Sequence, residues 1–312
     1  MKTAIVTGAC GFIGSNLVTE LLENDYAVCA VIRKDEEIYA DFAINDKVAL
    51  LFYDMVDYWK LRDEHILIDA DVLYHLSWAG VSDELSQSYK IQLQNVQNSC
   101  DLFESAIALK VKRFVFAGSI MEYEHDKAIQ KGYYNLSKRN IYHIAKNTAR
   151  NILQVIANNS GVEYLPITIS NVYGPGDRST RLINQLIISI ISKKKLSLTR
   201  CEQKYDFIYI DDAVRAIRLV GEAGKNNKNY YIGNKAPTIL LEYIIELYEA
   251  LDSGEPLGIG EKELQGVSLS YDEFDMLGLY DDLHFSTKTS FSQGVKSTRK
   301  WIEQYLLGKK II

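Results

Sequence analysis

The stretch TGACGFIG, Thr7–Gly14, is the most informative part of the sequence for the fold. It follows a short β-rich run and opens a segment whose apolar residues recur at helical spacing. Its glycines let the backbone turn sharply and approach a pyrophosphate, and the free N–H groups at the helix start attract the phosphate charge. A strand, a glycine loop and a helix in this order predict a dinucleotide-binding unit. The residues expected to hold the cofactor here are Gly8, Gly11, Phe12, Ile13 and Gly14.

Apolar runs and helical stretches alternate through the first half of the chain. The later predicted strands are 26–32, 48–54, 71–78, 112–119 and 162–170, and the two long helices are Ser86–Leu109 and Tyr134–Asn159. Continuous apolar strands between helices predict a parallel sheet covered on both faces. We expect a Rossmann-type doubly wound α/β domain over residues 1–170. A smaller mixed α/β substrate-binding region is expected over 171–312, with some segments returning to the first domain.

Composition and charge narrow the class of protein. The net charge of −6 argues against a nucleic-acid partner. The chain begins without a signal-peptide pattern, and its most apolar long segment, LINQLIISIISKKKL from Leu182, is too short to cross a bilayer. The four cysteines and five histidines show no metal-ligand spacing. We therefore expect a cytoplasmic protein with no metal, no membrane segment and no nucleic-acid partner.

The end of the second strand bears on the choice of cofactor. NAD sites place an acidic residue there to hold the ribose 2′-hydroxyl. This chain has Arg33 and Lys34 at that point, and Asp35 comes later. Because a guanidinium suits a 2′-phosphate, the sequence favours NADP(H), with NAD(H) as the alternative.

The segment GYYNLSKRN, from Gly132, carries Tyr134 and Lys138 at helical i, i+4 spacing. Four other Tyr–Lys pairs have this spacing, among them Tyr142–Lys146. Position distinguishes them: Ser119 ends the fifth strand, and Tyr134 is expected in the first turn of the following helix. Tyr142 would then lie about 12 Å further along that helix. The sequence therefore predicts Ser119, Tyr134 and Lys138 as the proton-transfer set, in which the lysine cation lowers the pKa of the tyrosine.

Taken together, these motifs resemble the extended short-chain dehydrogenase/reductase family, in particular its nucleotide-sugar branch. The resemblance rests on TGACGFIGSNL, YHLSWAG, NVQNSCDLFESA, FAGSIMEY, YNLSK, SNVYGPGD and CEQKYDFIYIDDAVRAI, in that order. It implies that Ser119, Tyr134 and Lys138 are the catalytic residues. Further residues are assigned to the cofactor site by the same resemblance: Asp54, Met55, Leu76, Ser77 and Asn95. Asn171 is expected near the sugar diphosphate.

The serine segment departs from the family pattern. The interval between Ser119 and Tyr134 is short and lacks the proline-bearing loop common before the tyrosine. Ile120 and Met121 follow Ser119 where dehydratase members carry an Asp–Glu pair, which argues against 4,6-dehydration. Glu122 comes one position late and is expected either to reach the substrate or to be a solvent-facing loop acid.

The second half also departs from the pattern. Many sugar-nucleotide epimerases place a diphosphate-binding arginine where this chain has Tyr205. A tyrosine can stack on a base or sugar but cannot neutralise phosphate, so the charge is expected to come from an arginine elsewhere. Arg181, which opens an apolar helix, is the first candidate.

These features predict an NAD(P)-dependent reductase of the C4 keto group of a nucleotide-linked 4-keto-6-deoxy sugar, with Tyr134 as proton donor. The alternative is a nucleotide-sugar 4-epimerase with tightly bound NAD, which uses the same residues. A 4,6-dehydratase and a non-catalytic NADP-binding protein are less favoured. The resemblance also implies a homodimer through the two long helices. An apolar stripe on the first of them can serve either a dimer or the core: Tyr89, Leu93, Val96 and Cys100.

Overall fold

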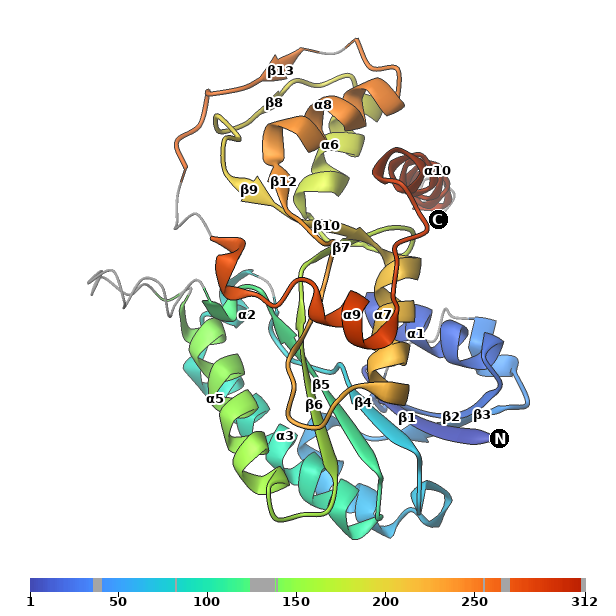
Figure 1. The fold of residues 1–312 in the computed structure, drawn as a ribbon. Coiled ribbons are helices and arrows are strands. Elements are labelled where there is room, and N and C mark those ends of the chain that lie inside the picture. The colour runs from blue at the N-terminus through green and yellow to red at the C-terminus, as the bar shows by residue number, and fades with distance from the viewer. Residues whose placement is uncertain are drawn as a thin grey trace. The chain divides into compact units, whose positions relative to one another are not determined.

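The computed structural model describes residues 1–35, 41–81, 83–123, 138, 140–254, 256–264 and 270–309 (Figure 1). The chain divides into two compact units. The first unit comprises residues 1–169, 214–232 and 278–285, and the second comprises 170–213, 233–277 and 286–312. Two segments of the second half therefore belong to the first unit.

The first unit is built on a seven-stranded sheet in which every neighbouring pair is parallel. In spatial order its strands are β11 (Tyr230–Ile232), β6 (Glu163–Ile169), β5 (Arg113–Ser119), β4 (Val72–His75), β1 (Lys2–Thr7), β2 (Tyr26–Ile32) and β3 (Val48–Phe52). The strands are apolar and mostly buried, as expected for a sheet covered on both faces. The predicted doubly wound α/β class is confirmed.

Helices cover both faces of this sheet (Figure 1). On one face α3 (Tyr89–Ala108) and α5 (Asn140–Ala157) pack side by side. On the other, α1 (Phe12–Glu23) is joined to the second half of α7 (Ile210–Ala223) by the ion pair between Arg218 and Glu20. The shorter elements of the unit are η1 (Asp41–Ile44), η2 (Met55–Asp63), η3 (His65–Leu67), α2 (Asp83–Ser86) and α9 (Gly278–Leu283).

The strand register brings several chain segments to one edge of the sheet. Thr7 pairs with His75, and Ser119 pairs with Ile169, so β1, β4, β5 and β6 all end at the same carboxyl edge. Open parallel sheets bind ligands at this edge. The glycine loop leaves β1 there, and the segment that contains Ser119 leaves β5 there.

The predicted helix Tyr134–Asn159 is wrong at its start. Lys138 is exposed and lies in a turn, and α5 begins at Asn140. Tyr134 lies outside the described residues. The geometric basis for the Tyr134–Lys138 pair, a shared helix face, is therefore absent at Lys138.

The apolar stripe predicted on α3 is divided between core and surface. Val96 is buried and Cys100 packs against the core of the first unit. Tyr89 and Leu93, by contrast, are 59% and 61% exposed. On the neighbouring helix α5, Val155 is 69% exposed. Each of the two helices thus exposes apolar side chains.

The second unit is smaller and built from short elements. Its helices are α6 (Leu182–Ile191), α8 (Leu240–Ala250), α10 (Phe291–Lys309) and the one-turn η4 (Tyr271–Glu273). Its strands form three two-stranded pairs: β7 (Asn171–Tyr173) with β10 (Phe207–Tyr209), β9 (Lys204–Tyr205) with β12 (Thr238–Ile239), and β8 (Leu196–Ser197) with β13 (Leu257–Gly258). An aromatic cluster of Tyr173, Phe207, Tyr243 and Phe291 supplies much of its core.

Among the described helices, none combines the length and the apolar character that a bilayer crossing requires. Within the same part of the chain, no cluster of His, Cys, Asp and Glu side chains is arranged to hold a metal ion.

Candidate active site

The glycine loop after β1 has no room for side chains. Gly8 has a φ of +71°, and a Cβ there would lie 2.9 Å from the backbone nitrogen of Ser77. A Cβ on Gly14 would overlap the carbonyl oxygen of Gly8. Gly11 is the N-cap of α1 and has no side chain to occupy the N–H groups of the first turn, which Phe12 and Ile13 begin. The loop therefore fits a dinucleotide pyrophosphate, which requires both close backbone approach and free N–H donors.

The basic residues after β2 differ in their surroundings. Arg33 and Lys34 are both exposed. The Lys34 ammonium lies 2.9 Å from Asp57, which Lys60 also pairs at 2.8 Å, and these two lysines hold the pKa of Asp57 below its usual value. The Lys34 ammonium is thus already paired with a carboxylate at the protein surface. Both basic residues stay predictions as contacts of a 2′-phosphate.

The predicted adenine contacts are Asp54 and Met55. They come directly after Tyr53, the first residue beyond β3. Asp54 is half-buried and is the N-cap of η2, without a side-chain capping bond. Met55 packs against the core cluster of the first unit. Both stay predictions as cofactor contacts.

A buried polar chain fixes the loop that follows β4. The His75 ring is hydrogen-bonded through Nδ1 to Thr7 Oγ1 at 2.9 Å and through Nε2 to Ser99 Oγ at 2.9 Å. Burial, with the charge of Lys146 as a smaller cause, lowers the His75 pKa to about 3, so this histidine is neutral. Ser77 donates to Thr7 Oγ1 at 3.1 Å and accepts from the Tyr58 hydroxyl at 2.9 Å. The loop is thereby held against the glycine turn.

Asn95 on α3 clamps the same loop from the other side. Its Oδ1 accepts the Ala79 N–H at 3.1 Å, and its Nδ2 donates to the Ala79 carbonyl at 2.8 Å. The side chain is 1% exposed. Asn95 therefore supports the loop after β4, which begins with Leu76 and Ser77, and its amide is occupied by that loop.

Ser119 stands at the carboxyl end of β5, as predicted, and its surroundings explain Glu122. The Ser119 N–H donates to Glu122 Oε1 at 2.6 Å, and the Met121 N–H donates to Ser119 Oγ at 3.2 Å. Glu122 is 2% exposed and its second oxygen accepts from Arg150 at 2.8 Å. The interpretation of Glu122 as a solvent-facing acid is wrong. Both of its carboxylate oxygens have protein partners, which is not the arrangement expected of a substrate contact.

The described part of α5 contains the other Tyr–Lys pair. Lys146 is 5% exposed, its ammonium donates to the Ala117 carbonyl of β5 at 2.6 Å, and it lies 4.1 Å from the centre of the Trp78 ring. Burial lowers the Lys146 pKa to about 7. Tyr142 is in the first turn of α5, and its ring meets the same Trp78 edge-on at 6.3 Å. The pair therefore flanks one residue of the loop after β4, beside the end of β5.

Sequence reasoning excluded Tyr142–Lys146 because it placed the helix start too early. Two signals pointed to the pair. Lys146 lies on the face of α5 that carries Ala149 and Leu153, where a lysine among buried apolar positions is unusual. The interval from Ser119 is also longer to Tyr142, 23 residues, than the 15 residues to Tyr134 that had already looked short.

The predicted substrate residues of the second unit are all described. Asn171 donates to the Asp206 carbonyl at 3.0 Å and is half-buried. Arg181 is the exposed N-cap of α6. Tyr205 lies in β9, with its ring 4.9 Å from that of Phe207. None of these positions tests a substrate contact, and all three stay predictions.

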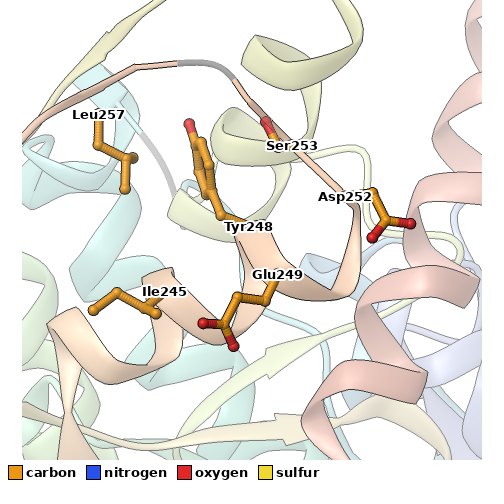
Figure 2. A pocket seen from close by; sticks show the side chains of 6 residues that line it. All are labelled: Ile245, Tyr248, Glu249, Asp252, Ser253 and Leu257. Carbon is orange, nitrogen blue, oxygen red and sulfur yellow. The ribbon is translucent and has the colours of Figure 1, made fainter.

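The second unit also has a shallow pocket of its own beside the end of α8 (Figure 2). Its walls are Ile245, Tyr248, Glu249, Asp252, Ser253 and Leu257. Two of the six are carboxylates and none is a cation. The pocket therefore does not suit a diphosphate, whose recognition requires positive charge or free N–H groups.

Comparison with known proteins agrees with this geometry. Residues 4–233 match the model of the NAD dependent epimerase/dehydratase family. A CDP-abequose synthase from Salmonella muenchen is 27% identical over 230 residues, which are 73% of each chain. A UDP-glucose 4-epimerase from Vibrio cholerae is 24% identical over 267 residues, 80% of this chain and 76% of the relative. Among solved structures, the UDP-N-acetylglucosamine 4-epimerase from Methanobrevibacter ruminantium superposes with a TM-score of 0.81 at 21% identity, covering 97% of this chain and 99% of that one.

Proposed function

The chain belongs to the NAD-dependent epimerase/dehydratase family, and from that premise we propose that it reduces the C4 keto group of a nucleotide-linked 4-keto-6-deoxy sugar. The membership confirms the predicted enzyme class, a short-chain dehydrogenase/reductase of the nucleotide-sugar branch. One observation supports the mechanism. The buried Lys146 and Tyr142, which lies one helical turn before it, flank the loop after β4, at the sheet edge where the glycine loop lies.

The cofactor is held, in this proposal, by the residues that leave room for it. Gly8, Gly11 and Gly14 admit the pyrophosphate, and the loop of Leu76 and Ser77 forms the adjoining wall. A nicotinamide dinucleotide, when bound, supplies the hydride. Arg33 is proposed to meet the 2′-phosphate of NADP(H), with NAD(H) as the alternative.

Proton transfer is assigned to Tyr142 rather than to Tyr134. As hydride reaches C4, the Tyr142 hydroxyl donates its proton to the former keto oxygen. The Lys146 cation lowers the pKa of the Tyr142 hydroxyl. Ser119 donates a hydrogen bond to the same oxygen. Lys146 has the burial and the partners that such a role needs, whereas Lys138 is exposed. Tyr134 and Lys138 stay as the rival pair, which a direct substitution test separates.

The nucleotide is proposed to be CDP. Two relatives at 27% identity are named CDP-abequose synthases, and the second, from Salmonella typhimurium, matches 260 residues. Asn171, Arg181 and Tyr205 are the proposed contacts of the second unit with the sugar nucleotide. The proposed location is the cytoplasm.

A homodimer through α3 and α5 is part of the proposal. Tyr89 and Leu93 on α3 and Val155 on α5 supply exposed apolar area on two adjacent helices. Sedimentation analysis of wild type and of Leu93→Glu tests it. The expected result is a dimer that the charge converts to a monomer.

A 4-epimerase is the second candidate function, because family members that epimerise at C4 use the same set of residues. The V. cholerae relative bears that name. The two functions differ in how the cofactor is held: a reductase exchanges it each turnover, whereas an epimerase returns the hydride and keeps it bound.

The test is a screen of NADPH oxidation with 4-keto-6-deoxy sugars carried on CDP, dTDP, GDP and UDP. We expect stoichiometric NADPH consumption, fastest with the CDP sugar. In parallel, the purified protein is denatured and any released nucleotide is identified. Tightly held NAD⁺, together with interconversion of C4 epimers and no net NADPH use, would overturn the reductase in favour of the epimerase.

A further inference from the structure

A buried ion pair lies directly behind the end of β5. The side chains of Glu122 and Arg150 are 3% and 11% exposed, and Arg150 Nε lies 2.8 Å from Glu122 Oε2. Burying two charges costs more than a surface pair can return, so such a pair is a poor source of stability by itself. The contacts of the pair indicate what it does instead.

One end of the pair holds the backbone of Ser119. The peptide N–H of Ser119 donates to Glu122 Oε1 at 2.6 Å. Gly118 makes the approach possible, because a Cβ there would overlap Arg150 Nη2 and would lie 2.7 Å from Glu122 Oε1. The carboxylate therefore fixes the direction in which the chain leaves β5 at Ser119.

The other end of the pair is anchored across the sheet. Arg150 Nη1 donates to Asn229 Oδ1 at 2.8 Å, and Nη2 donates to the Ile167 carbonyl at 3.3 Å. Asn229 in turn donates to Thr168 Oγ1 at 2.9 Å. The Arg150 guanidinium is thus hydrogen-bonded to β6 and to the residue before β11. These contacts hold it in place independently of the turn that follows Ser119.

The pair also acts electrostatically on Lys146, one turn earlier on α5. Burial is the main cause that lowers the Lys146 pKa; Glu122 opposes this effect and Arg150 adds to it. On β4 the facing group is His75, which is neutral because it is buried. The contacts of Lys146 with β5 are the Ala117 carbonyl and the Phe116 ring, neither of which carries a formal charge. Among the described residues, the formal charges that act on Lys146 are those of Glu122 and Arg150.

We propose that Glu122 and Arg150 are a positioning pair that holds Ser119 in place and balances the charge of Lys146. The proposal rests on the proposed function, in which Ser119 and Lys146 serve proton transfer. It assigns to Glu122 a role through its neighbours, in place of the substrate contact that the sequence suggested.

The test removes the anion of the pair in one variant and the cation in another, and follows the pH dependence of kcat/KM. Because proton transfer needs the Lys146 cation, kcat/KM should fall at alkaline pH as Lys146 deprotonates. Glu122→Gln removes the anion and should move this fall to lower pH. Arg150→Met removes the cation and should move it to higher pH. Glu20→Gln breaks an ion pair of similar burial between α1 and α7 and should leave the fall unmoved. Shifts in the same direction, or none, would overturn the electrostatic part.

The double variant Glu122→Leu/Arg150→Met tests positioning without leaving a buried charge unpaired. Such replacements are often tolerated, so the protein should fold. We expect kcat to fall about 10-fold with the KM for cofactor unchanged, since the Ser119 N–H has lost its acceptor. A wild-type kcat would overturn the positioning role.

A readout without substrate separates this proposal from the proposed function. The free energy of unfolding of wild type minus that of Lys146→Met isolates the contribution of Lys146. The pH at which this difference begins to rise marks the loss of the Lys146 charge in the folded protein. Glu122→Gln should move this onset down and Arg150→Met should move it up, even if no sugar nucleotide is turned over. An onset that both variants leave in place would overturn the proposal, whatever the substrate.

Discussion

Lys138 and Lys146 are eight residues apart in sequence and occupy opposite environments. Lys138 is exposed in a turn, whereas Lys146 is 5% exposed, bonded to the Ala117 carbonyl and seated over Trp78. Each follows a tyrosine by four residues, so spacing alone does not distinguish them. Environment therefore separates two motifs that spacing does not: of these two lysines, Lys146 is the one desolvated beside the strand end that carries Ser119.

The largest expected effect is on turnover when the buried lysine is replaced. Lys146→Met should lower kcat by about 10²- to 10³-fold, because it removes the cation that activates the tyrosine. Lys138→Met, the matched control, should keep kcat within about 2-fold. Steady-state kinetics with the sugar nucleotide accepted in the screen measure both. Equal losses at the two lysines would break the comparison.

The second effect is on the pH dependence of stability. The folded-state pKa of Lys146 is about 7, against an ordinary value of 10.5. Between these values the unfolded chain binds the proton and the folded protein does not, so the free energy of unfolding rises with pH across this window. At roughly 1.4 kcal/mol per pKa unit, the upper limit of this rise is about 5 kcal/mol.

Chemical denaturation of wild type and Lys146→Met from pH 6 to 10 measures this difference. The variant should lack the rise, and Lys138→Met should retain it. A rise that persists in Lys146→Met would mean that another group causes it.

A third variant separates loss of cofactor from loss of proton transfer. Gly14→Ala should weaken cofactor binding by about 10²-fold, because its Cβ overlaps the Gly8 carbonyl and forces the loop apart. Gly161→Ala is the control: its φ is +79°, but nothing lies within 4 Å of the added Cβ, so only stability should fall, by about 1 kcal/mol. Calorimetric titration with NADPH tests the pair. Unchanged affinity in Gly14→Ala would place the cofactor elsewhere.

The smallest expected effect concerns the choice of cofactor. Arg33→Ser should raise the KM for NADPH about 10-fold and leave that for NADH unchanged, since it removes one charge-assisted contact with the 2′-phosphate. Lys34→Ser should change the ratio less, because Lys34 is already paired with Asp57. An Arg33 variant whose preference for NADPH over NADH equals that of wild type would contradict the assignment of Arg33 to the 2′-phosphate.

Much of the fold was predictable because strand and helix periodicity in the first unit is strong. The predicted strand 26–32 matches β2 exactly, and the glycine loop lies where TGACGFIG places it. The start of α5 was hard to predict from the sequence, because Asn135, Ser137 and Asn140 are all residue types that can cap a helix and offer competing start points. Because the two Tyr–Lys pairs are eight residues apart, an error of a few residues at this boundary changes which pair is expected near Ser119.

The surroundings of Glu122 were beyond sequence reasoning for a different physical reason. Its partner Arg150 is 28 residues away and on another element, and only the fold brings the two together. A charged residue in a loop is normally solvated, so its local sequence favoured the wrong environment. Long-range pairing of this kind leaves no periodic signal in either segment.

The central claim is that Tyr142, and not Tyr134, transfers the proton. Tyr142→Phe and Tyr134→Phe, compared in single-turnover reduction with NADPH bound, test it most directly. We expect a rate loss of about 10²- to 10³-fold in Tyr142→Phe and a change within about 3-fold in Tyr134→Phe, with cofactor affinity kept in both. The reverse order of losses would return the chemistry to Tyr134 and Lys138.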